Sequence, residues 1–329
     1  SSSSAASDVY KRQVLRGLQK ILMGLETFRR FSKKMIIDPA KIAKKYIDEV
    51  SKEIVAKKLN INMLGLIATK DKPSISYAKA TQKKFADVGI NYDLQRVARL
   101  ELEQVIDEAN KNPLIHGIFI YFPVFDNQQD NYLRNQVDYR KDIEAGSLYW
   151  TQKLYTNDRL AHKNSSKKAL LPCTPLAIIK LLTEIGGYSS HAQPLKNKKV
   201  TIFNRSEVIG RPLAMMMSND GAKVYSFDIN GPLLFENAMP SETNISRSEA
   251  LHESQIVVTG VPNNDFALIE SGEISDGAIC VNFSSVNNFS EDISTKTDIF
   301  VPRIGPMTVA MCMRNVLRLY QNYQEQANA

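Results

Sequence analysis

The sequence predicts an α/β protein of two domains, each built on a parallel sheet. Short apolar runs alternate with segments whose apolar residues recur at helical spacing, a pattern typical of strand–helix–strand units. A length of 329 residues suits two domains. Apolar residues make up 43% of the chain and charged residues 23%, which is an ordinary globular composition.

The first half of the chain shows a helix–strand–helix–strand order. Asp38 before Pro39 predicts a helix start, because aspartate caps helices and proline suits the first helical position. Apolar residues then recur at helical spacing over 43–54, and runs 62–69 and 115–122 are typical of buried strands. The helix between these strands carries one face made of Tyr77, Thr81, Phe85 and Val88.

The second half is richer in strands. After a polar segment at 155–170, which we expect to be a surface loop, a helix begins at Thr174. Residues 239–254 are rich in Ser and Glu and are expected to form a loop, and Thr308 is expected to cap a last amphipathic helix. Short apolar runs predict strands at 200–203, 223–227, 256–259, 278–283 and 299–301. Five strands separated by helical or polar segments predict a doubly wound, Rossmann-type nucleotide-binding domain.

The net charge of +7 is concentrated at the N-terminus. Residues 1–35 carry +6 and the remaining chain carries +1, so no phosphate-tracking face for nucleic acid is predicted. We expect the leader 1–35 to be disordered or artefactual: 1–13 resembles translated vector sequence, and 14–34 loosely resembles a mitochondrial presequence. No uncharged apolar run reaches ~18 residues, which excludes a membrane-spanning protein. Three cysteines far apart predict neither a disulfide framework nor a metal site.

A candidate phosphate loop follows the run 200–203. The polar turn after this strand opens a helix, so backbone N–H groups and the positive helix end would face a phosphate. Asn204 stands where glycine is usual and tolerates a positive φ, and Gly210 would let the helix approach the strand. Arg205 and Ser206 are placed to reach a pyrophosphate. The candidate cofactor-binding residues of this segment are Asn204, Arg205, Ser206, Gly210, Arg211 and Pro212.

Asp228 supports the dinucleotide interpretation. It ends the next strand, 18 residues after Gly210. In dinucleotide-binding domains, an acidic residue ~20 residues after the glycine motif binds the adenosine ribose hydroxyls. Its carboxylate would repel the extra phosphate of NADP, so we predict NAD. The alternative is that Asp228 only closes the strand end. After the following strand, the candidate loop over the cofactor is Gly260, Val261 and Pro262.

Three separated motifs occur in order: CTP at 173–175, RSEVIGRP at 205–212 and GPMTVAM at 305–311. With these motifs the chain resembles the methylenetetrahydrofolate dehydrogenase/cyclohydrolase family over about residues 36–325. The resemblance implies methylenetetrahydrofolate as substrate, NAD as cofactor, no nucleic-acid or membrane partner, and a homodimer. It also implies a folate-binding catalytic domain at 36–172, an NAD-binding domain at 173–308, and a C-terminal helix, 309–325, that returns to the first domain.

The departures from the family pattern are informative. Tyr77 matches the tyrosine of the family's Tyr-x-x-x-Lys pair, but Thr81 stands at the lysine position. Tyr121 replaces the glutamine that supports that lysine, and Glu144 replaces the second aspartate of a Lys-Asp-Val-Asp-Gly motif. The combination resembles the monofunctional NAD-dependent enzymes known from fungi.

The resemblance assigns roles to these positions. Tyr77 is expected to stack on the pterin ring, and Glu144 to accept two N–H donors from its amide edge. Thr81 and Tyr121 complete the candidate catalytic set. The further substrate-binding candidates are Pro123, Gly305, Pro306 and Thr308.

The missing lysine predicts a dehydrogenase without cyclohydrolase activity. Hydride transfer from the methylene bridge moves no proton, whereas hydrolysis of the methenyl product needs an acid–base group near neutral pKa. Threonine cannot supply one, and Lys84, one further turn along, is the remaining alternative. The other hypotheses are a bifunctional dehydrogenase/cyclohydrolase, a non-catalytic NAD- or folate-binding regulator, and a basic nucleic-acid-binding protein. We expect a cytoplasmic enzyme serving purine biosynthesis, or a mitochondrial one if the leader is genuine.

Overall fold

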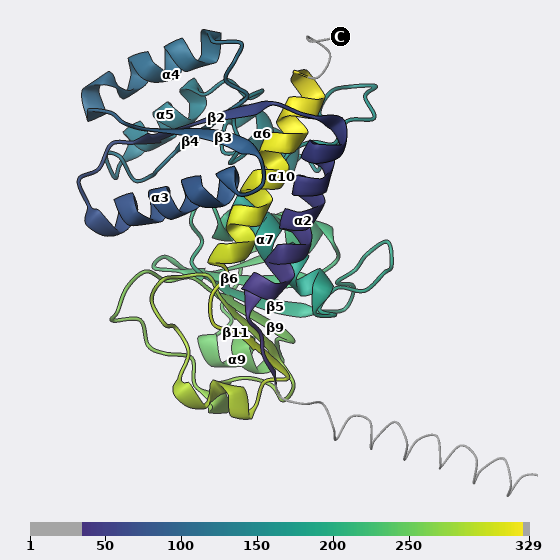
Figure 1. Cartoon of the computed structure of the whole chain (residues 1–329). Coiled ribbons are helices and arrows are strands. Elements are labelled where there is room, and N and C mark those ends of the chain that lie inside the picture. The colour runs from purple at the N-terminus through teal and green to yellow at the C-terminus, as the bar shows by residue number, and fades with distance from the viewer. Residues whose placement is uncertain (1–34, 325–329) are drawn as a thin grey trace, which may run out of the picture.

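The computed structural model describes residues 35–324 as two α/β domains joined along one side by long helices (Figure 1). The first domain is built on a three-stranded parallel sheet with the order β3-β2-β4. Its strands are β2 (Ile61–Ile67), β3 (Ile90–Arg96) and β4 (Gly117–Ile120). Its helices are α2 (Pro39–Lys57), α3 (Lys72–Ala86), α4 (Leu102–Lys111), α5 (Gln128–Gln136) and α6 (Leu148–Tyr155). A short 3₁₀ helix, η1, spans Arg99–Glu101.

The second domain is a larger sheet of eight strands with the order β1-β11-β10-β9-β5-β6-β7-β8. The strands that follow the predictions are β5 (Lys199–Phe203), β6 (Lys223–Asp228), β9 (Ile256–Thr259), β10 (Ile279–Asn282) and β11 (Ile299–Val301). The helices are α7 (Cys173–Glu184), α8 (Gly210–Asn219), α9 (Arg247–Glu253) and α10 (Gly305–Tyr323), with 3₁₀ turns η2 (Ser271–Glu273) and η3 (Glu291–Thr295). The predicted two-domain α/β fold with a doubly wound second domain is thus confirmed.

The chain order around β5 creates a switch point. From β5 the chain goes to β6 on one side, and it later returns to β9 on the other side, with both neighbours parallel to β5. In open α/β sheets, ligands bind outside the carboxyl ends of the strands at such a point. The loops that follow β5 and β9 contain the two candidate cofactor segments.

The prediction of a loop at 239–254 is wrong. Residues 239–242 form β8, paired antiparallel with β7 (Gly231–Glu236), and α9 follows. The hairpin turns through Asn237 and Ala238, which both have positive φ, the geometry that suits a two-residue hairpin. The start of α9 carries a capping box between Ser246 and Glu249.

Both ends of the described chain differ from expectation. The leader prediction falls on residues 1–34, which lie outside the described residues, but Met35 forms β1 with Ile36, parallel to β11. Thr308 is not a helix cap, because α10 begins three residues earlier at Gly305 and includes Pro306 in its first turn. The three cysteines are free and buried. Within residues 35–324, no helix is both long enough and apolar enough to cross a membrane.

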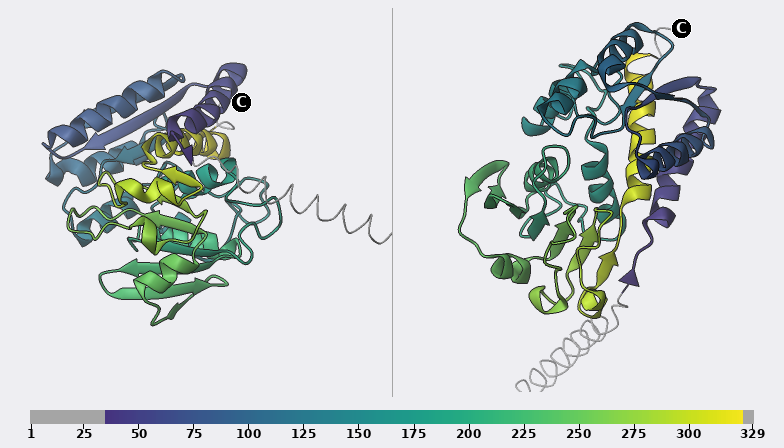
Figure 2. Two further views of the ribbon diagram at one scale, coloured as in Figure 1. Left: turned by 90° about the horizontal axis from the view of Figure 1, so that it is seen from below. Right: turned by 90° about the vertical axis from the view of Figure 1, so that its left-hand side faces the viewer.

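The two domains share one continuous core. α10 packs against α2 and α7, and the three helices run along one side of both sheets (Figure 2). α10 also approaches β4 closely: a Cβ built on Gly117 would lie 2.8 Å from Val316. Two smaller apolar clusters cover the opposite faces of the two sheets.

A glycine in the first sheet makes room for a pair of contacting tyrosines. The Tyr92 hydroxyl lies 2.7 Å from the Tyr121 hydroxyl, and both side chains are buried. A Cβ built on Gly65 would lie 2.3 Å from the Tyr92 hydroxyl. Any side chain at position 65 would therefore displace the pair.

We expect Gly65→Ala to destabilise the protein by about 1–3 kcal/mol, the range for overpacking a buried site. Gly272→Ala is the matched control, because a Cβ built there meets nothing within 4 Å. Urea unfolding of both variants measures the difference. Equal stabilities for the two variants would contradict the tight fit at Gly65.

Candidate active site

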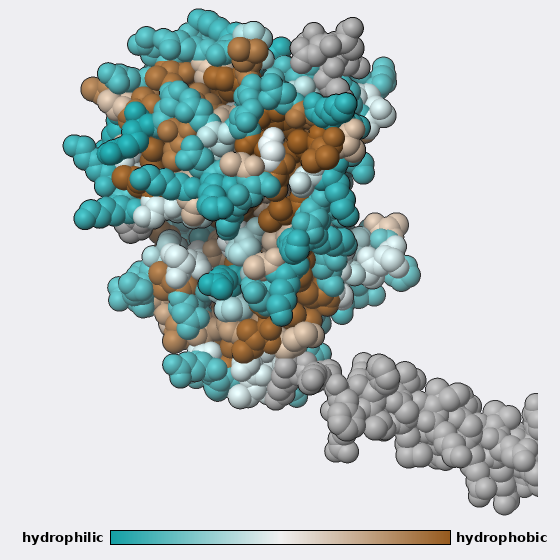
Figure 3. All heavy atoms as spheres, in the orientation of Figure 1, coloured by the Kyte–Doolittle hydropathy of each residue, from teal (hydrophilic) through white to brown (hydrophobic). Residues whose placement is uncertain are grey.

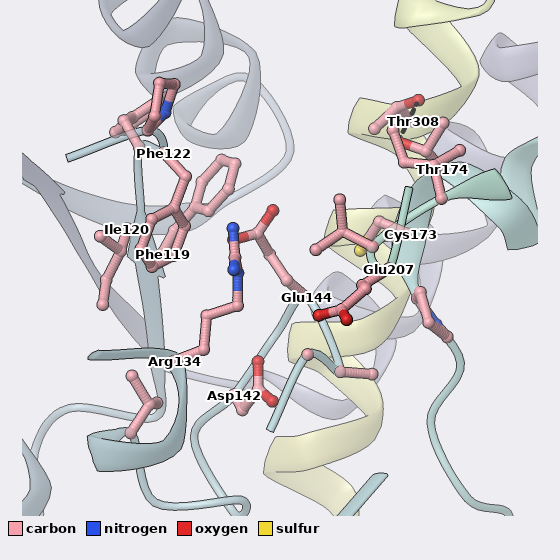
Figure 4. A pocket seen from close by; sticks show the side chains of 18 of the residues that line it. Phe119, Ile120, Phe122, Arg134, Asp142, Glu144, Cys173, Thr174, Glu207 and Thr308 are labelled. Carbon is pink, nitrogen blue, oxygen red and sulfur yellow. Dashed lines mark hydrogen bonds between the residues drawn. The ribbon is translucent and has the colours of Figure 1, made fainter. Parts of the chain in front are cut away.

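A cavity of about 830 Å³ lies between the two domains and is lined by both. The first domain contributes the carboxyl ends of β2 and β4 together with α3, and the second contributes the loop after β5 and the start of α7. The outline of the molecule narrows at this level between the domains (Figure 3). Figure 4 shows the side chains that point into the cavity.

Tyr77 and Tyr121 form one wall of the cavity. Their ring centroids are 6.3 Å apart and their planes meet at 84°, an edge-to-face pair. Tyr77 is 46% exposed, so its ring is available to a ligand. Thr81 lies one turn further along α3, is buried, and donates its hydroxyl to the Tyr77 carbonyl oxygen at 2.9 Å. Of the three predicted catalytic residues, the cavity lining thus contains the two tyrosines but not Thr81.

Tyr121 is held from behind by Tyr92, which sequence reasoning missed. The hydroxyl groups of the two tyrosines form a buried hydrogen bond with each other. Burial raises the pKa of Tyr121 to about 12. Tyr121 is therefore neutral at pH 7, and the Thr81 hydroxyl does not ionise in this range, so neither group is an acid–base catalyst near neutral pH. Tyr92 lies on β3, which β2 separates from β4 in the sheet, and no motif marks it.

Glu144 and Asp142 lie on the loop that follows β4 and α5. The backbone N–H of Ser147 donates to Asp142 Oδ2 at 2.7 Å, which shapes the loop. Burial, and next the nearby Asp142 carboxylate, raise the pKa of Glu144 to about 8, while Arg134 opposes this shift. The Arg134 guanidinium and the Glu144 carboxylate point toward one another (Figure 4). Arg134 was not predicted, because nothing in its helix distinguishes it from a surface arginine.

The remaining substrate candidates divide into two groups. Pro123, which follows a cis peptide bond, and Thr308 line the cavity. Gly305 and Pro306 lie in the first turn of α10, outside the lining. The Thr308 hydroxyl lies 3.4 Å from the hydroxyl of Thr174, so the starts of α10 and α7 meet at the cavity wall.

The turn after β5 has the shape expected of a phosphate loop. Asn204 has a φ of +92°, donates from Nδ2 to the Gly260 carbonyl at 2.6 Å, and accepts from the Ser206 N–H at 2.8 Å. A Cβ built on Gly210 would lie 1.6 Å from the Asn204 carbonyl oxygen. Only glycine fits at position 210, and the start of α8 is thereby brought against the turn.

Arg205 does not have the position that was predicted. Its guanidinium donates to the Ser226 and Gly231 carbonyls and to Asp228 Oδ1 at 2.6 Å, and its side chain is only 9% exposed. The expectation that it reaches a pyrophosphate is therefore wrong for this structure. Arg205 instead orients Asp228, whose Oδ1 also accepts the Asn230 N–H at 2.7 Å.

The loop after β9 is fixed by a residue that the motifs did not include. Asn288 is fully buried, accepts from the Val261 N–H at 2.8 Å and donates to the Val261 carbonyl at 3.0 Å. Gly260 lies against the ring of Phe283, where a Cβ would lie 1.9 Å from a ring atom. Pro262, next along, is exposed.

The phosphate loop also reaches the cavity. Its Glu207, Val208 and Ile209 line the cavity with Pro212. Arg211 is not in the lining, but its guanidinium lies 6.0 Å from the ring centroid of Tyr155, which is in the lining. Glu207 Oε2 accepts from Asn131 Nδ2 at 3.3 Å, a contact between the two domains. Among residues 35–324, no group of three or more His, Cys, Asp or Glu is arranged to hold a metal.

Two family models match the chain. Residues 37–144 match the catalytic domain of tetrahydrofolate dehydrogenase/cyclohydrolase, and residues 172–324 match its NAD(P)-binding domain. The division at 172–173 predicted from the sequence stays a prediction, because α10 packs against helices from both sides of it.

Individual relatives agree with the family models. The chain is 40% identical over 301 residues, 88% of its length and 96% of the relative's, to a methylenetetrahydrofolate dehydrogenase [NAD(+)] of Dictyostelium discoideum. The structure of an NAD-dependent 5,10-methylenetetrahydrofolate dehydrogenase from Saccharomyces cerevisiae superposes with a TM-score of 0.83 at 34% identity, covering 89% of this chain and 99% of that one. A bifunctional protein FolD of Bacillus velezensis is 25% identical over 86% of the chain and 96% of its own length. The chain therefore belongs to the tetrahydrofolate dehydrogenase/cyclohydrolase family.

Proposed function

We propose that the chain oxidises methylenetetrahydrofolate to methenyltetrahydrofolate, passes the hydride to NAD, and does not hydrolyse the product. The observation that carries this proposal is what stands at and behind the cavity wall: Tyr121 lines the cavity, and Thr81 and Tyr92 are buried behind the lining. Where bifunctional members resembling this chain have a lysine and a glutamine, it has a helix-bonded threonine and a tyrosine bonded to a second tyrosine. The names of the relatives at 34–40% identity support the same activity.

The residues of the cavity suit a hydride transfer. NAD supplies the hydride acceptor, and the protein has to align the two reactants and stabilise the positive charge that develops on the folate. The exposed ring of Tyr77 offers a stacking surface for the pterin. The cavity lining contains four acidic side chains, Asp71, Asp142, Glu144 and Glu207. Those that are ionised favour a cation there.

NAD fits the second domain on structural grounds. The glycines at 210 and 260 leave room that any side chain would fill, at the two loops beside the switch point. Asp228 stands at the end of β6 with Oδ1 engaged by Arg205. Its second oxygen, Oδ2, accepts no hydrogen bond from the described residues, and we assign it to the adenosine ribose hydroxyls.

Few groups near this wall can assist hydrolysis. Lys141 donates to three carbonyl oxygens, of Ala109, Asn110 and Asn112. Lys84 is exposed and does not line the cavity. Burial raises the pKa of Glu144 to about 8, and an acid–base group in this range favours the bifunctional alternative. In the proposed function Glu144 is occupied by the pterin edge.

Product analysis tests the proposal. With methylenetetrahydrofolate and NAD as substrates, we expect NADH and methenyltetrahydrofolate to accumulate together. The separate absorbances of the two products measure this accumulation. Formyl product appearing at the rate of NADH would show the bifunctional enzyme. No turnover with either cofactor would favour a non-catalytic NAD- or folate-binding protein.

Cofactor choice depends on the Arg205–Asp228 pair. In Asp228→Ser, the guanidinium loses its carboxylate and becomes free to bind the extra phosphate of NADP. We expect the ratio of kcat/KM for NADP to that for NAD to rise at least tenfold. The variant loses the repulsion between the Asp228 carboxylate and the extra phosphate, and the Arg205 guanidinium becomes available to bind that phosphate.

The double variant Asp228→Ser/Arg205→Ala is the matched control. It removes the repulsion but also the freed cation, so it should lose most of the gain in NADP use. An unchanged cofactor ratio in the single variant would contradict the role of Asp228. Equal gains in the single and double variants would contradict the role of Arg205.

The raised pKa of Glu144 predicts a pH dependence of folate binding. Accepting two N–H groups requires the carboxylate, but below about pH 8 the free enzyme carries the protonated acid. We expect the KM for folate to rise as the pH falls below about 8, by at most a factor of about ten per pH unit for one linked proton. In Glu144→Gln the KM should be high and independent of pH over this range, with the KM for NAD unchanged. A variant that keeps the wild-type pH profile would assign the titration to another group, Asp142 being the nearest.

We also propose a homodimer that works in the cytoplasm and supplies one-carbon units for purine biosynthesis. β8 forms one edge of the large sheet, with all four residues exposed and pairing on one side only. Such an edge is suited to an interface with a second copy. A solution mass of one chain would contradict the dimer, and fractionation of cells carrying the full-length protein tests the compartment.

A further inference from the structure

We propose that a basic groove beside the folate cavity binds the carboxylates of the substrate's glutamate tail. Tetrahydrofolates end in a glutamate, to which further glutamates can be joined through the γ-carboxylate, so the ligand is a flexible chain of carboxylates. The inference rests on the proposed function, because it requires a folate substrate in the neighbouring cavity. It adds a binding site in a part of the fold that hydride transfer does not use.

The groove is the second cavity of the first domain. It has a volume of about 690 Å³ and is lined by residues 67–71 and 96–99. These segments follow β2 and β3, which are paired in parallel with Ile67 opposite Arg96. The folate cavity occupies the carboxyl ends of β2 and β4, so the two cavities lie side by side at the same edge of the sheet. Thr69 and Asp71 line both of them.

The lining of the groove is cationic. Lys70, Arg96 and Arg99 all belong to it and are exposed. Arg99 lies 5.9 Å from the centroid of the Phe125 ring. Across residues 35–324, neither Lys70 nor Arg96 forms an ion pair or side-chain hydrogen bond. The acid in this lining, Asp71, accepts from the Ser74 N–H at 2.8 Å and its hydroxyl at 2.6 Å, and so caps α3.

The folate cavity offers a chain of carboxylates fewer cations than the groove does. Its lining contains one cation, Arg134, beside four acids, Asp71, Asp142, Glu144 and Glu207. Burial raises the pKa of Asp142 and of Glu144, and neither acid provides a cationic partner for a polyanion. A glutamate tail is therefore expected to leave this cavity, and the adjoining groove offers unpaired cations next to a shared rim.

The strand geometry places Arg96 on the appropriate side of the sheet. Side chains alternate along a strand, so Arg96 and Tyr92 project from the same face of β3. Tyr92 contacts Tyr121, which pairs with Tyr77 in the folate cavity. Tyr92 itself is buried, so a ligand stacked on Tyr77 would reach Arg96 by way of Thr69 and Asp71, the rim that the two cavities share. The planar guanidinium of Arg96 suits carboxylates, which it can bind through two hydrogen bonds.

The test compares the enzyme's KM for methylenetetrahydrofolate carrying one glutamate and carrying five. Lys70→Ala/Arg96→Ala removes two cations of the groove. We expect the KM for the five-glutamate substrate to rise about three- to tenfold, because each exposed ion pair is worth a factor of about 1.5 to 5. The one-glutamate KM should change by less than about twofold, and the KM for NAD not at all. Raising the salt to about 0.5 M should reduce the wild-type preference for the longer tail, since exposed pairs are screened.

Lys79→Ala is the matched control. Lys79 is an exposed cation on α3 that lines neither cavity. Equal KM changes for both substrates, or the same change in Lys79→Ala, would overturn the groove while leaving the proposed function intact. Absence of turnover by the wild-type protein with either substrate would overturn the proposed function, and the groove with it.

Discussion

The burial of α10 against α2 and α7 is the constraint on which the site depends. Twelve of the residues in this helix are buried, and the ten apolar ones join the same core as the larger sheet and the first domain. Its first turn places Thr308 at the cavity, while a later turn holds Val316 against β4. One rigid element therefore sets the spacing between the folate-binding wall and the second domain. Hydride transfer demands such a spacing, because reacting atoms must be held about 3–3.5 Å apart.

Charge is distributed according to what each part of the substrate needs. Acidic side chains line the cavity in which the folate would become cationic, together with one arginine, and burial raises the pKa of one of these acids, Glu144, to about 8. Cations are found outside, where the polyanionic end of the substrate would emerge. The same low dielectric that raises the pKa of Glu144 makes each ionised group in the cavity more effective than it would be in water. A single pocket could not meet both demands.

The fold was largely predictable, because local patterns determine it. The strands at 256–259 and 299–301 agree residue for residue, since each is a short apolar run with clear ends. The β7–β8 hairpin was missed because β8 is fully exposed and has no apolar alternation. The roles of residues that contact partners distant in sequence were harder to predict. A motif identified Arg205, but the direction of its side chain depends on Asp228 and two carbonyls beyond the motif. Tyr92 and Asn288 act only through tertiary contacts, which single-sequence patterns do not contain.

The pairing of β1 with β11 makes the second domain discontinuous. Met35 lies opposite Ile299, so the outermost strand of the large sheet comes from the start of the described chain and its neighbour from near the end. During synthesis, β1 leaves the ribosome early and has no sheet to join until β11 follows. The whole first domain and four of the other parallel strands are made in the interval. Contacts of such long range are slow to form, so the edge of the nucleotide-binding sheet is among the last parts of the molecule to be completed.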